Sequence, residues 1–248
     1  MKAWEVVEQQ YDMNVLRSTW EFKLKRYPDV LIKKFKICFF ARGYMQLEGI
    51  DFFETYAPVV QWMTAKLMLI LEVLLGLKSK QGNVTAGFLH AGLGEDEKVF
   101  VDMPQGFEVK GNNVRNKVLK FNKMLYGLRQ SPRAFWKYIT SNMELYGMVH
   151  SNIDPYLFIG DKVMAIIYVD GILFWSVNVN DIHDKAMKLR EQGVDLEQED
   201  DAAGFLGVTL GRDETTELMG MKQVGIIDRV IETLVLDDRM DKGKFATA

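Results

Sequence analysis

Two apolar, β-prone runs at residues 163–168 and 172–176 flank an Asp-Gly pair. Runs of this kind around Asp-Gly are among the strongest short-range indications of a tight β-hairpin. The sequence therefore predicts a hairpin with Asp170 and Gly171 at its turn. A hairpin turn is normally exposed, so the Asp170 carboxylate could meet a metal ion or a substrate. Taken alone, the segment favours a plain structural hairpin over a functional site.

Composition restricts the class of protein. The chain has 248 residues, of which 48% are hydrophobic and 12% aromatic, enough for one large domain or two tightly joined subdomains. Its most apolar stretch, residues 67–77, is too short to span a bilayer and carries Glu72, and the N-terminus lacks the apolar run of a secretory signal. The single cysteine, Cys38, excludes an internal disulfide and a cysteine-based zinc site. We therefore expect an intracellular protein, cytoplasmic or nuclear, with no membrane partner.

Charge is unevenly distributed along this chain of net charge −3. Residues 17–42 hold eight Lys or Arg and two acids, and residues 110–137 hold eight Lys or Arg and no acid. Residues 181–217 hold eleven acids and four bases. Two basic blocks in an acidic chain fit a cationic cleft for a phosphate backbone, but they equally fit solvated faces of unrelated elements.

Hydrophobic periodicity predicts alternating helices and strands. An apolar run without a polar face predicts a buried helix at 64–77, and Ser131 followed by Pro132 is a plausible N-cap for a helix at 131–147. The order favours an α+β fold, an antiparallel sheet with helices packed on one face. The remaining expected elements are strands at 99–103, 156–159, 163–168, 172–176, 205–210 and 218–222, and helices at 181–193 and 223–236.

Several short motifs follow one another along the chain. They are TYAPVV at 55–60, NVTAGFLHA at 83–91, VFVDMPQGF at 99–107, LYGLRQSPR at 125–133, DPYLF at 154–158, YVDG at 168–171 and FLGV at 205–208. Each is weak alone. Together, in this order, they closely resemble the reverse transcriptase domain of Ty1/copia-type retrotransposon Pol polyproteins. The resemblance covers nearly the whole chain, from about Ser18 to Ala248.

The resemblance implies a right-hand polymerase fold with fingers and palm, and template-directed nucleotidyl transfer by an RNA-directed DNA polymerase. We expect one reverse transcriptase domain over residues 1–248, with a fingers-like segment at about 18–62 and a palm with fingers insertions at about 63–248. No RNase H, integrase or protease domain is expected within it. The implied partners are an RNA template, a DNA primer and deoxynucleoside triphosphates. Other parts of a retrotransposon polyprotein are possible partners as well.

The resemblance also implies a metal site. In such polymerases two Mg²⁺ ions, about 3.5–4 Å apart, stabilise the phosphoryl transfer and are held by three carboxylates. The matching positions here are Asn83, Asp170 and Gly171, so only the carboxylate of Asp170 remains. Loss of even one preorganised stabilising group can cost on the order of 10²–10³ in rate. We therefore expect a degenerate copy, inactive or nearly so, with weakened Mg²⁺ binding.

Five other positions match substrate-binding residues of the family. Lys36 lies in a fingers segment, and Phe88 matches an aromatic that excludes the ribose 2′-hydroxyl, although it could equally be a core residue. Tyr126, Arg129 and Gln130 belong to a motif that grips the incoming nucleotide and the template, or that serves only as architecture.

One departure concerns the expected triphosphate contact. Cys38 stands where the resemblance implies an Arg, and a thiol cannot replace the bidentate guanidinium fork. Two alternatives to an impaired polymerase therefore remain. One is a non-catalytic nucleic-acid-binding remnant, and the other is a domesticated interaction domain that binds protein.

Overall fold

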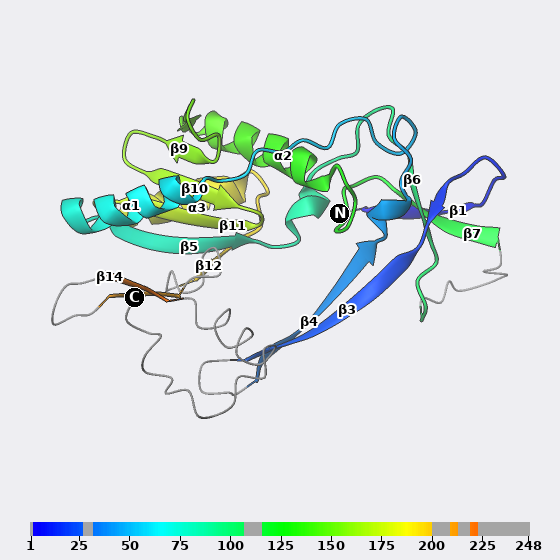
Figure 1. Cartoon of the computed structure of the whole chain (residues 1–248), viewed down its shortest axis with the longest axis horizontal. Coiled ribbons are helices and arrows are strands. Elements are labelled where there is room, and N and C mark those ends of the chain that lie inside the picture. Colours follow the sequence, from blue (N-terminus) through cyan, green and yellow to red (C-terminus); the bar gives the residue numbers. More distant parts are fainter. Residues whose placement is uncertain (1, 27–31, 107–115, 200–208, 213–218, 223–248) are drawn as a thin grey trace, which may run out of the picture.

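The computed structural model describes residues 2–26, 32–106, 116–199, 209–212 and 219–222. Its elements in chain order are β1 (Trp4–Glu8), β2 (Val15–Leu16), β3 (Ser18–Arg26), β4 (Ile32–Ala41), η1 (Gly43–Met45), α1 (Trp62–Leu75), β5 (Lys78–Val84), η2 (Gly87–His90), β6 (Val99–Asp102), β7 (Lys117–Phe121), α2 (Ser131–Leu145), β8 (Val149–His150), β9 (Leu157–Ile159), β10 (Met164–Tyr168), β11 (Gly171–Ser176), α3 (Val179–Glu191), β12 (Leu196–Glu199), β13 (Thr209–Arg212) and β14 (Met219–Lys222). Helices and antiparallel strands alternate, which confirms the α+β class (Figure 1).

The largest sheet has six strands in the order β12-β5-β11-β10-β9-β8, and every neighbouring pair is antiparallel. Its centre is β11, in which all six residues are buried. This explains why residues 172–175 are continuously apolar rather than alternating, since both faces of the strand are covered. The three strands predicted around the Asp-Gly pair are confirmed as β9, β10 and β11.

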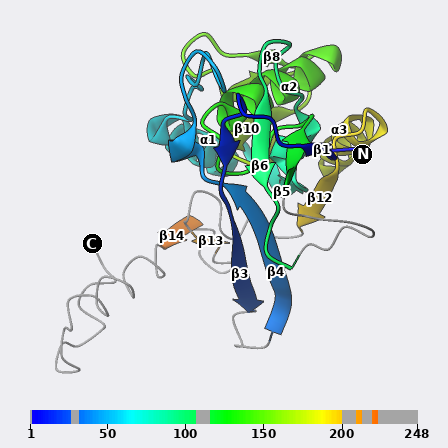
Figure 2. The ribbon, with the colours of Figure 1, turned by 90° about the vertical axis from the view of Figure 1, so that its right-hand side faces the viewer.

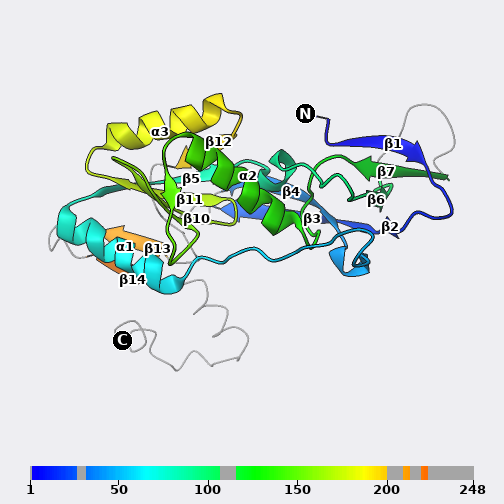
Figure 3. The same ribbon diagram turned by 90° about the horizontal axis from the view of Figure 1, so that it is seen from above.

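Helices cover both faces of this sheet, not one face as the sequence predicted. Glu72 of α1 accepts hydrogen bonds from Ser79 of β5 and Trp175 of β11, which are cross-strand neighbours on the same face. In Figure 2, α3 lies on the opposite side of the sheet from α1. Figure 3 shows α2 lying over the strands between them. The main core joins all three helices to the sheet.

The α1 helix is only half buried, which corrects the prediction of a buried helix. Its inward residues include Ala65 and Met68. Met63, Leu67 and Leu74 are more than half exposed. Because the helix is apolar all round, its sequence could not indicate which face would be covered.

The start of α2 differs from the expected cap. Gln130 occupies the N-cap, and Ser131 is already the first helical residue. The Ser131 hydroxyl instead donates to the Leu125 carbonyl at 2.6 Å, within the preceding turn. The α3 helix has a side-chain cap, because Asn178 accepts from the backbone N–H of Asn180.

The N-terminal part forms a second sheet and a ribbon. The second sheet has the order β1-β7-β6-β2, with β2 and β6 parallel. Strands β3 and β4 pair antiparallel over almost their whole length and project from the rest of the molecule as a long ribbon (Figures 1 and 2).

Two expected elements lie outside the described residues, in whole or in part. These are the helix at 223–236 and residues 205–208 of the strand at 205–210. In the part of the chain that is described, no helix is long and apolar enough to cross a membrane.

Candidate active-site cleft

The turn of the β10–β11 hairpin places Asp170 beside the end of β5. Tyr168 pairs with Gly171, so the two-residue turn is Val169–Asp170 and not Asp170–Gly171 as the sequence predicted. Val169 has a φ of 56°, whereas Gly171 is not among the residues with positive φ and begins β11. The backbone carbonyl of Asp170 accepts from the N–H of Val84 at 2.7 Å, which fixes the turn to β5.

Three strands bring one row of residues to this end of the sheet. Gly171 of β11 lies opposite Asn83 of β5, and Asn83 lies opposite Glu197 of β12. Directly opposed residues on neighbouring strands project from the same face of a sheet. From β11 to β12, the row therefore consists of Gly171, which has no side chain, the amide of Asn83 and the carboxylate of Glu197. It lies next to Asp170.

A cleft of about 700 Å³ opens over this row. Its lining includes Asn83, Asp170 and Glu197 from the large sheet, and Lys34 and Lys36 from the β3–β4 ribbon. Lys34 Nζ and Glu197 Oε2 lie 4.0 Å apart across it. The structure thus brings Asn83 and Asp170, two of the three predicted metal-site positions, and Lys36 to one cleft, while the third position, Gly171, lies opposite Asn83 on β11.

Tyr126 forms the side of the cleft next to Asp170. Its hydroxyl donates to Asp170 Oδ2 in a long contact of 3.5 Å. Burial, and secondarily the negative charge of Asp170, raises the pKa of Tyr126 to about 12. The phenol is therefore protonated at neutral pH and available as a donor.

Close backbone packing fixes Tyr126 to the base of the ribbon. The N–H of Ala41, the last residue of β4, donates to the Tyr126 carbonyl at 2.9 Å. Gly127 has a φ of 92°, and a Cβ there would lie 2.1 Å from the Ala41 carbonyl oxygen. Only glycine fits this position, so the Tyr-Gly turn of the sequence motif has a clear architectural reason.

Phe88 lies in an aromatic cluster rather than free in the cleft. Its ring meets Tyr126 edge-on with centroids 4.6 Å apart and meets Phe135 at 5.8 Å. On the side of Val169 it lines a smaller apolar cavity of about 270 Å³. Phe88 therefore supports the Tyr126 ring, as expected of a core aromatic, while remaining next to the Asp170 turn.

Arg129 and Gln130 point away from the cleft. Gln130 is 1% exposed, accepts from Gln46 Nε2 and donates to the Asp51 carbonyl. Arg129 donates through Nε to the Gly43 carbonyl. Both side chains connect the start of α2 to the 43–52 segment, and neither lines the cleft around Asp170.

Cys38 lines the cleft on β4, two residues beyond Lys36. It is partly buried and lies opposite Glu21. The thiol thus occupies the place from which the implied Arg would reach the cleft, and it adds no positive charge there.

The donor groups do not fit a two-Mg²⁺ site. Mg²⁺ prefers an octahedron of oxygen ligands with one or two carboxylates per ion. The predicted positions supply one carboxylate, from Asp170, and one neutral amide, from Asn83. Among the residues that the structure describes, no group of three or more His, Cys, Asp or Glu side chains could hold a metal ion.

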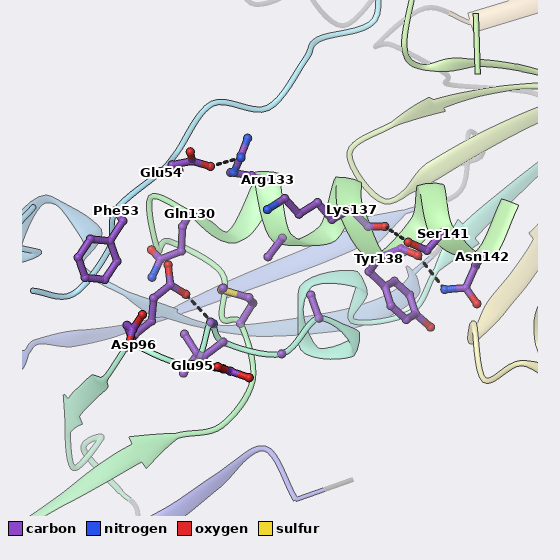
Figure 4. Close-up of a pocket in the computed structure, with 17 residues that line it drawn as sticks. Phe53, Glu54, Glu95, Asp96, Gln130, Arg133, Lys137, Tyr138, Ser141 and Asn142 are labelled. Atoms are coloured by element: carbon purple, nitrogen blue, oxygen red, sulfur yellow. Dashed lines mark hydrogen bonds and ion pairs between the residues drawn. The ribbon is translucent and has the colours of Figure 1, made fainter. Parts of the chain in front are cut away.

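A second cavity, of about 580 Å³, lies between α2 and the 91–97 loop (Figure 4). Arg133 and Lys137 of α2 line it, but Arg133 is paired with Glu54. The loop adds Glu95 and Asp96, and Glu97 lines the cavity as well. Acids outnumber bases there, so this cavity does not suit a phosphate backbone.

Comparison with known proteins identifies the family. A family model described as reverse transcriptase (RNA-dependent DNA polymerase) matches residues 1–244. The chain belongs to the reverse transcriptase family. This confirms the resemblance drawn from the ordered motifs.

Its relatives place this reverse transcriptase domain among the copia-type elements. It is 29% identical over 240 residues to the retrovirus-related Pol polyprotein from transposon TNT 1-94 of Nicotiana tabacum, covering 93% of this chain and 17% of that protein. It is 29% identical over 204 residues to the Pol polyprotein from transposon RE1 of Arabidopsis thaliana, covering 81% of this chain and 14% of that protein. The reverse transcriptase domain thus spans a small part of the length of these relatives.

Among solved structures, the reverse transcriptase domain is similar to a foamy viral protease–reverse transcriptase in complex with double-stranded DNA. The TM-score is 0.44 with 14% sequence identity, over 91% of this chain and 33% of that one. A likeness this distant does not locate site residues.

Sequence reasoning missed Glu197. It lies in an acidic stretch whose composition indicates a solvent-exposed surface. Only the pairing of β12 with β5 brings Glu197 beside Asn83. No local pattern could indicate this, because 113 residues of chain separate the two positions along the sequence. The relevant information is the strand order.

Proposed function

We propose that this copia-type reverse transcriptase domain binds a primer–template duplex in the cleft over Asp170, but that it is impaired in nucleotidyl transfer. The observation that carries the proposal is the pairing of Asn83 with Gly171 beside Asp170. Two of the three positions that would hold metal ions have no carboxylate, and they meet at one point of the sheet. Phosphates bound there would lack most of their electrostatic stabilisation.

We assign the six-stranded sheet with α1, α2 and α3 to a palm, which fits the expected palm at about 63–248. The β3–β4 ribbon and the 43–61 segment correspond to the fingers-like segment at about 18–62. The second sheet is shared between the two, because β1 and β2 precede residue 18 whereas β6 and β7 follow residue 63. Fingers formed from both stretches would explain the palm insertions.

Lys36 and Tyr126 are our candidates for contacts with bound substrate. Lys36 lines the cleft and lies opposite Lys23, whose charge is offset by Glu21 at 2.8 Å. A phosphate in the cleft would be attracted by the Lys36 ammonium group. Tyr126 would donate a hydrogen bond beside Asp170, and Phe88 would hold its ring and limit space near the sugar. Arg129 and Gln130 are positioning residues in this proposal, acting through the 43–52 segment.

Primer extension on an RNA template tests the chemistry, with Mg²⁺ or Mn²⁺ and deoxynucleoside triphosphates. We expect negligible extension by the wild-type chain. The double substitution Asn83→Asp and Gly171→Asp should restore extension, and addition of Cys38→Arg should increase it further. Gly171 has no positive φ, so Asp at this position would not strain the backbone.

A matched control separates site chemistry from added charge. Asn180→Asp with Gly92→Asp makes the same two residue changes away from the cleft, at an exposed helix position and at a glycine with open space around its Cβ direction. This control should stay inactive. Robust extension by the wild-type chain, or restoration by the control, would contradict the proposal.

A second candidate is a binding remnant that holds nucleic acid without any metal. The cationic ribbon favours it, since Lys34 and Lys36 line the cleft. Binding of an RNA–DNA heteroduplex in EDTA, weakening steeply as salt rises, would support this candidate. Absence of binding at low salt would instead favour an interaction domain that binds protein.

A further inference from the structure

The outer side of α1 carries a straight apolar row. Each of its residues is more than half exposed, and they are Met63, Leu67, Ile70 and Leu74. Their spacings of four, three and four residues align them along one side of the helix. The residues that pack against the sheet lie on another side. We call this exposed row the α1 seam.

A row with this spacing fits a helical partner. Apolar residues that alternate three and four apart form the contact line between packed helices, because the side chains of one helix enter the spaces between those of the other. The α1 seam runs from Met63 to Leu74, about 17 Å along the helix. A matching partner is therefore a helix of about three turns with an apolar row of its own.

The helix predicted from sequence at 223–236 has such a row. Its apolar residues recur at spacings of three, four and three, and they are Val224, Ile227, Ile231 and Leu234. The predicted helix and α1 also have the same length, 14 residues. A helix this short is marginal in water by itself, so it needs an apolar surface on which to pack.

Charge beside the two rows is complementary. Lys66 precedes Leu67 of the α1 seam, and its ammonium group lies over the Trp62 ring, 5.7 Å from the centroid. Asp228 and Glu232 follow two residues of the other row and supply the opposite charge. A second copy of α1 would supply none, since the single acid of this helix, Glu72, is buried.

The end of β14 lies close enough for the segment to reach α1. β14 ends at Lys222, directly before residue 223. Figures 1 and 3 place the β13–β14 hairpin at the same end of the long axis as α1. In Figure 2 both lie on the side of the molecule away from α3. The chain therefore continues from β14 on the side where the seam is exposed.

We propose that residues 223–236 pack as a helix on the α1 seam and cover it within the same chain. This segment is the occupant because it follows β14 directly, matches the seam in length and pattern, and supplies acids for Lys66. The inference goes beyond the proposed function and does not depend on nucleic-acid binding.

Disulfide cross-linking in the full chain tests the contact. Cys38→Ser first removes the single native thiol. The α1 seam then receives Leu67→Cys or Ile70→Cys, and the segment receives Ile227→Cys or Ile231→Cys. The four combinations allow for either direction of packing, because a disulfide needs Cα atoms within about 7 Å. At least one combination should lose its free thiols as a cross-linked monomer, with a yield independent of protein concentration.

A matched control moves the second cysteine off the row. Thr233→Cys lies on the opposite side of the predicted helix from Ile231. Combined with Leu67→Cys in the same background, it should keep its free thiols under the same conditions.

Maleimide labelling of Leu67→Cys gives a second measurement that needs no disulfide geometry. Ile227→Asp with Ile231→Asp should release the segment and raise the labelling rate about tenfold, equivalent to about 1.4 kcal/mol of contact free energy. Arg229→Asp with Thr233→Asp adds negative charge on the opposite side of the predicted helix. That control should leave the rate unchanged.

The contrary outcomes are clear. Cross-linking between chains by Leu67→Cys alone, with a yield that rises with protein concentration, would place a second copy on the seam and overturn the inference. Free thiols in all four combinations, or equal labelling rates in both acidic variants, would show that residues 223–236 do not cover α1. Primer extension and heteroduplex binding are measured separately, so failure here leaves the proposed function standing.

Discussion

The two ends of the β5–β11 strand pair differ in what their side chains can do. At the core end, Ser79 lies opposite Trp175, and both donate to the two oxygens of Glu72 at 2.9 and 2.8 Å. At the cleft end, Asn83 lies opposite Gly171, and neither supplies a carboxylate. One strand pair thus combines a fully satisfied buried acid with an incomplete acidic site.

The difference separates packing from chemistry. Residues that hold the sheet together are present at the core end, where loss of any partner would leave a buried polar group unpaired. Under the proposed function, the carboxylates missing at the cleft end would contact ions and substrate, not the core. The domain is therefore expected to fold normally while lacking its reaction, and this expectation can be tested at each end.

The largest effect is expected for Trp175→Ala at the core end. Trp175 is fully buried, and its removal leaves a cavity and takes a donor from Glu72. The free energy of unfolding should fall by about 3–5 kcal/mol, measured by urea denaturation. Trp62→Ala, at a partly exposed position, should cost clearly less. Equal losses would show that the core end is not the better packed one.

Glu72→Gln should have the next largest effect. The amide keeps one acceptor oxygen for the Trp175 indole N–H, and its N–H₂ group would donate to the Ser79 hydroxyl, so two hydrogen bonds to a charged carboxylate become two neutral ones. We expect a loss of about 1–3 kcal/mol in the free energy of unfolding. Glu191→Gln, at the exposed end of α3, is the control and should cost little. If Glu72→Gln left the free energy of unfolding unchanged, the two hydrogen bonds to the Glu72 carboxylate would not stabilise the core.

At the cleft end, Asn83→Asp with Gly171→Asp should make stability depend on Mg²⁺. Without metal, the two new carboxylates lie beside those of Asp170 and Glu197, and the repulsion among the four should lower the free energy of unfolding by about 1 kcal/mol. Added Mg²⁺ should raise the Tm of this variant by binding the folded state, and should leave the wild-type Tm unchanged. A Mg²⁺-dependent rise in the wild-type Tm would show that the cleft end already holds the ion.

Val169→Gly should stabilise the domain slightly. A φ of 56° costs a β-branched residue about 1–2 kcal/mol, while glycine loses about 0.5–1 kcal/mol more chain entropy on folding. We expect a net gain of about 0.5 kcal/mol from these two values. Val177→Gly, at an exposed position without positive φ, should destabilise instead. The comparison is made by thermal unfolding.

A separate prediction concerns stability at alkaline pH. Burial raises the pKa of Tyr126 and of Tyr156 to about 12, from the usual value near 10. The unfolded chain therefore loses these phenolic protons first, so stability is retained below pH 10 and lost as pH rises toward 12. Tyr126→Phe should make this loss less steep, as followed by urea midpoints between pH 8 and 11.5. Tyr56→Phe, at an exposed position, should leave it unchanged.

The strands around the hairpin could be predicted from sequence, because apolar runs of five or six residues between turns have a local cause. The half-buried state of α1 could not be predicted, because the sequence of a helix that is apolar on every side does not indicate which face is covered. The turn position was also missed. Asp-Gly favours a turn locally, but the pairing of Gly171 with both Tyr168 and Asn83 places it in the strand.

The site was predictable only in part, for a similar reason. The motifs led to Asn83, Asp170, Tyr126 and Lys36, which do meet in one cleft. They did not reveal that Gln130 is buried, because its partners belong to a segment about 80 residues away. The aromatic side chains of the cleft lining come from four strands of two sheets, so no stretch of sequence shows them together. They are Trp4, Trp20, Phe39 and Phe121.

The ordinary backbone of Gly171 has a practical consequence. At a position with positive φ, glycine is required for folding, because any side chain there strains the backbone. Gly171 has no positive φ, so its backbone conformation does not require glycine. A screen for folded protein would therefore accept Asp and Gly there alike, and only a screen for synthesis would tell them apart. In this domain, shape and solubility report nothing about whether the polymerase works.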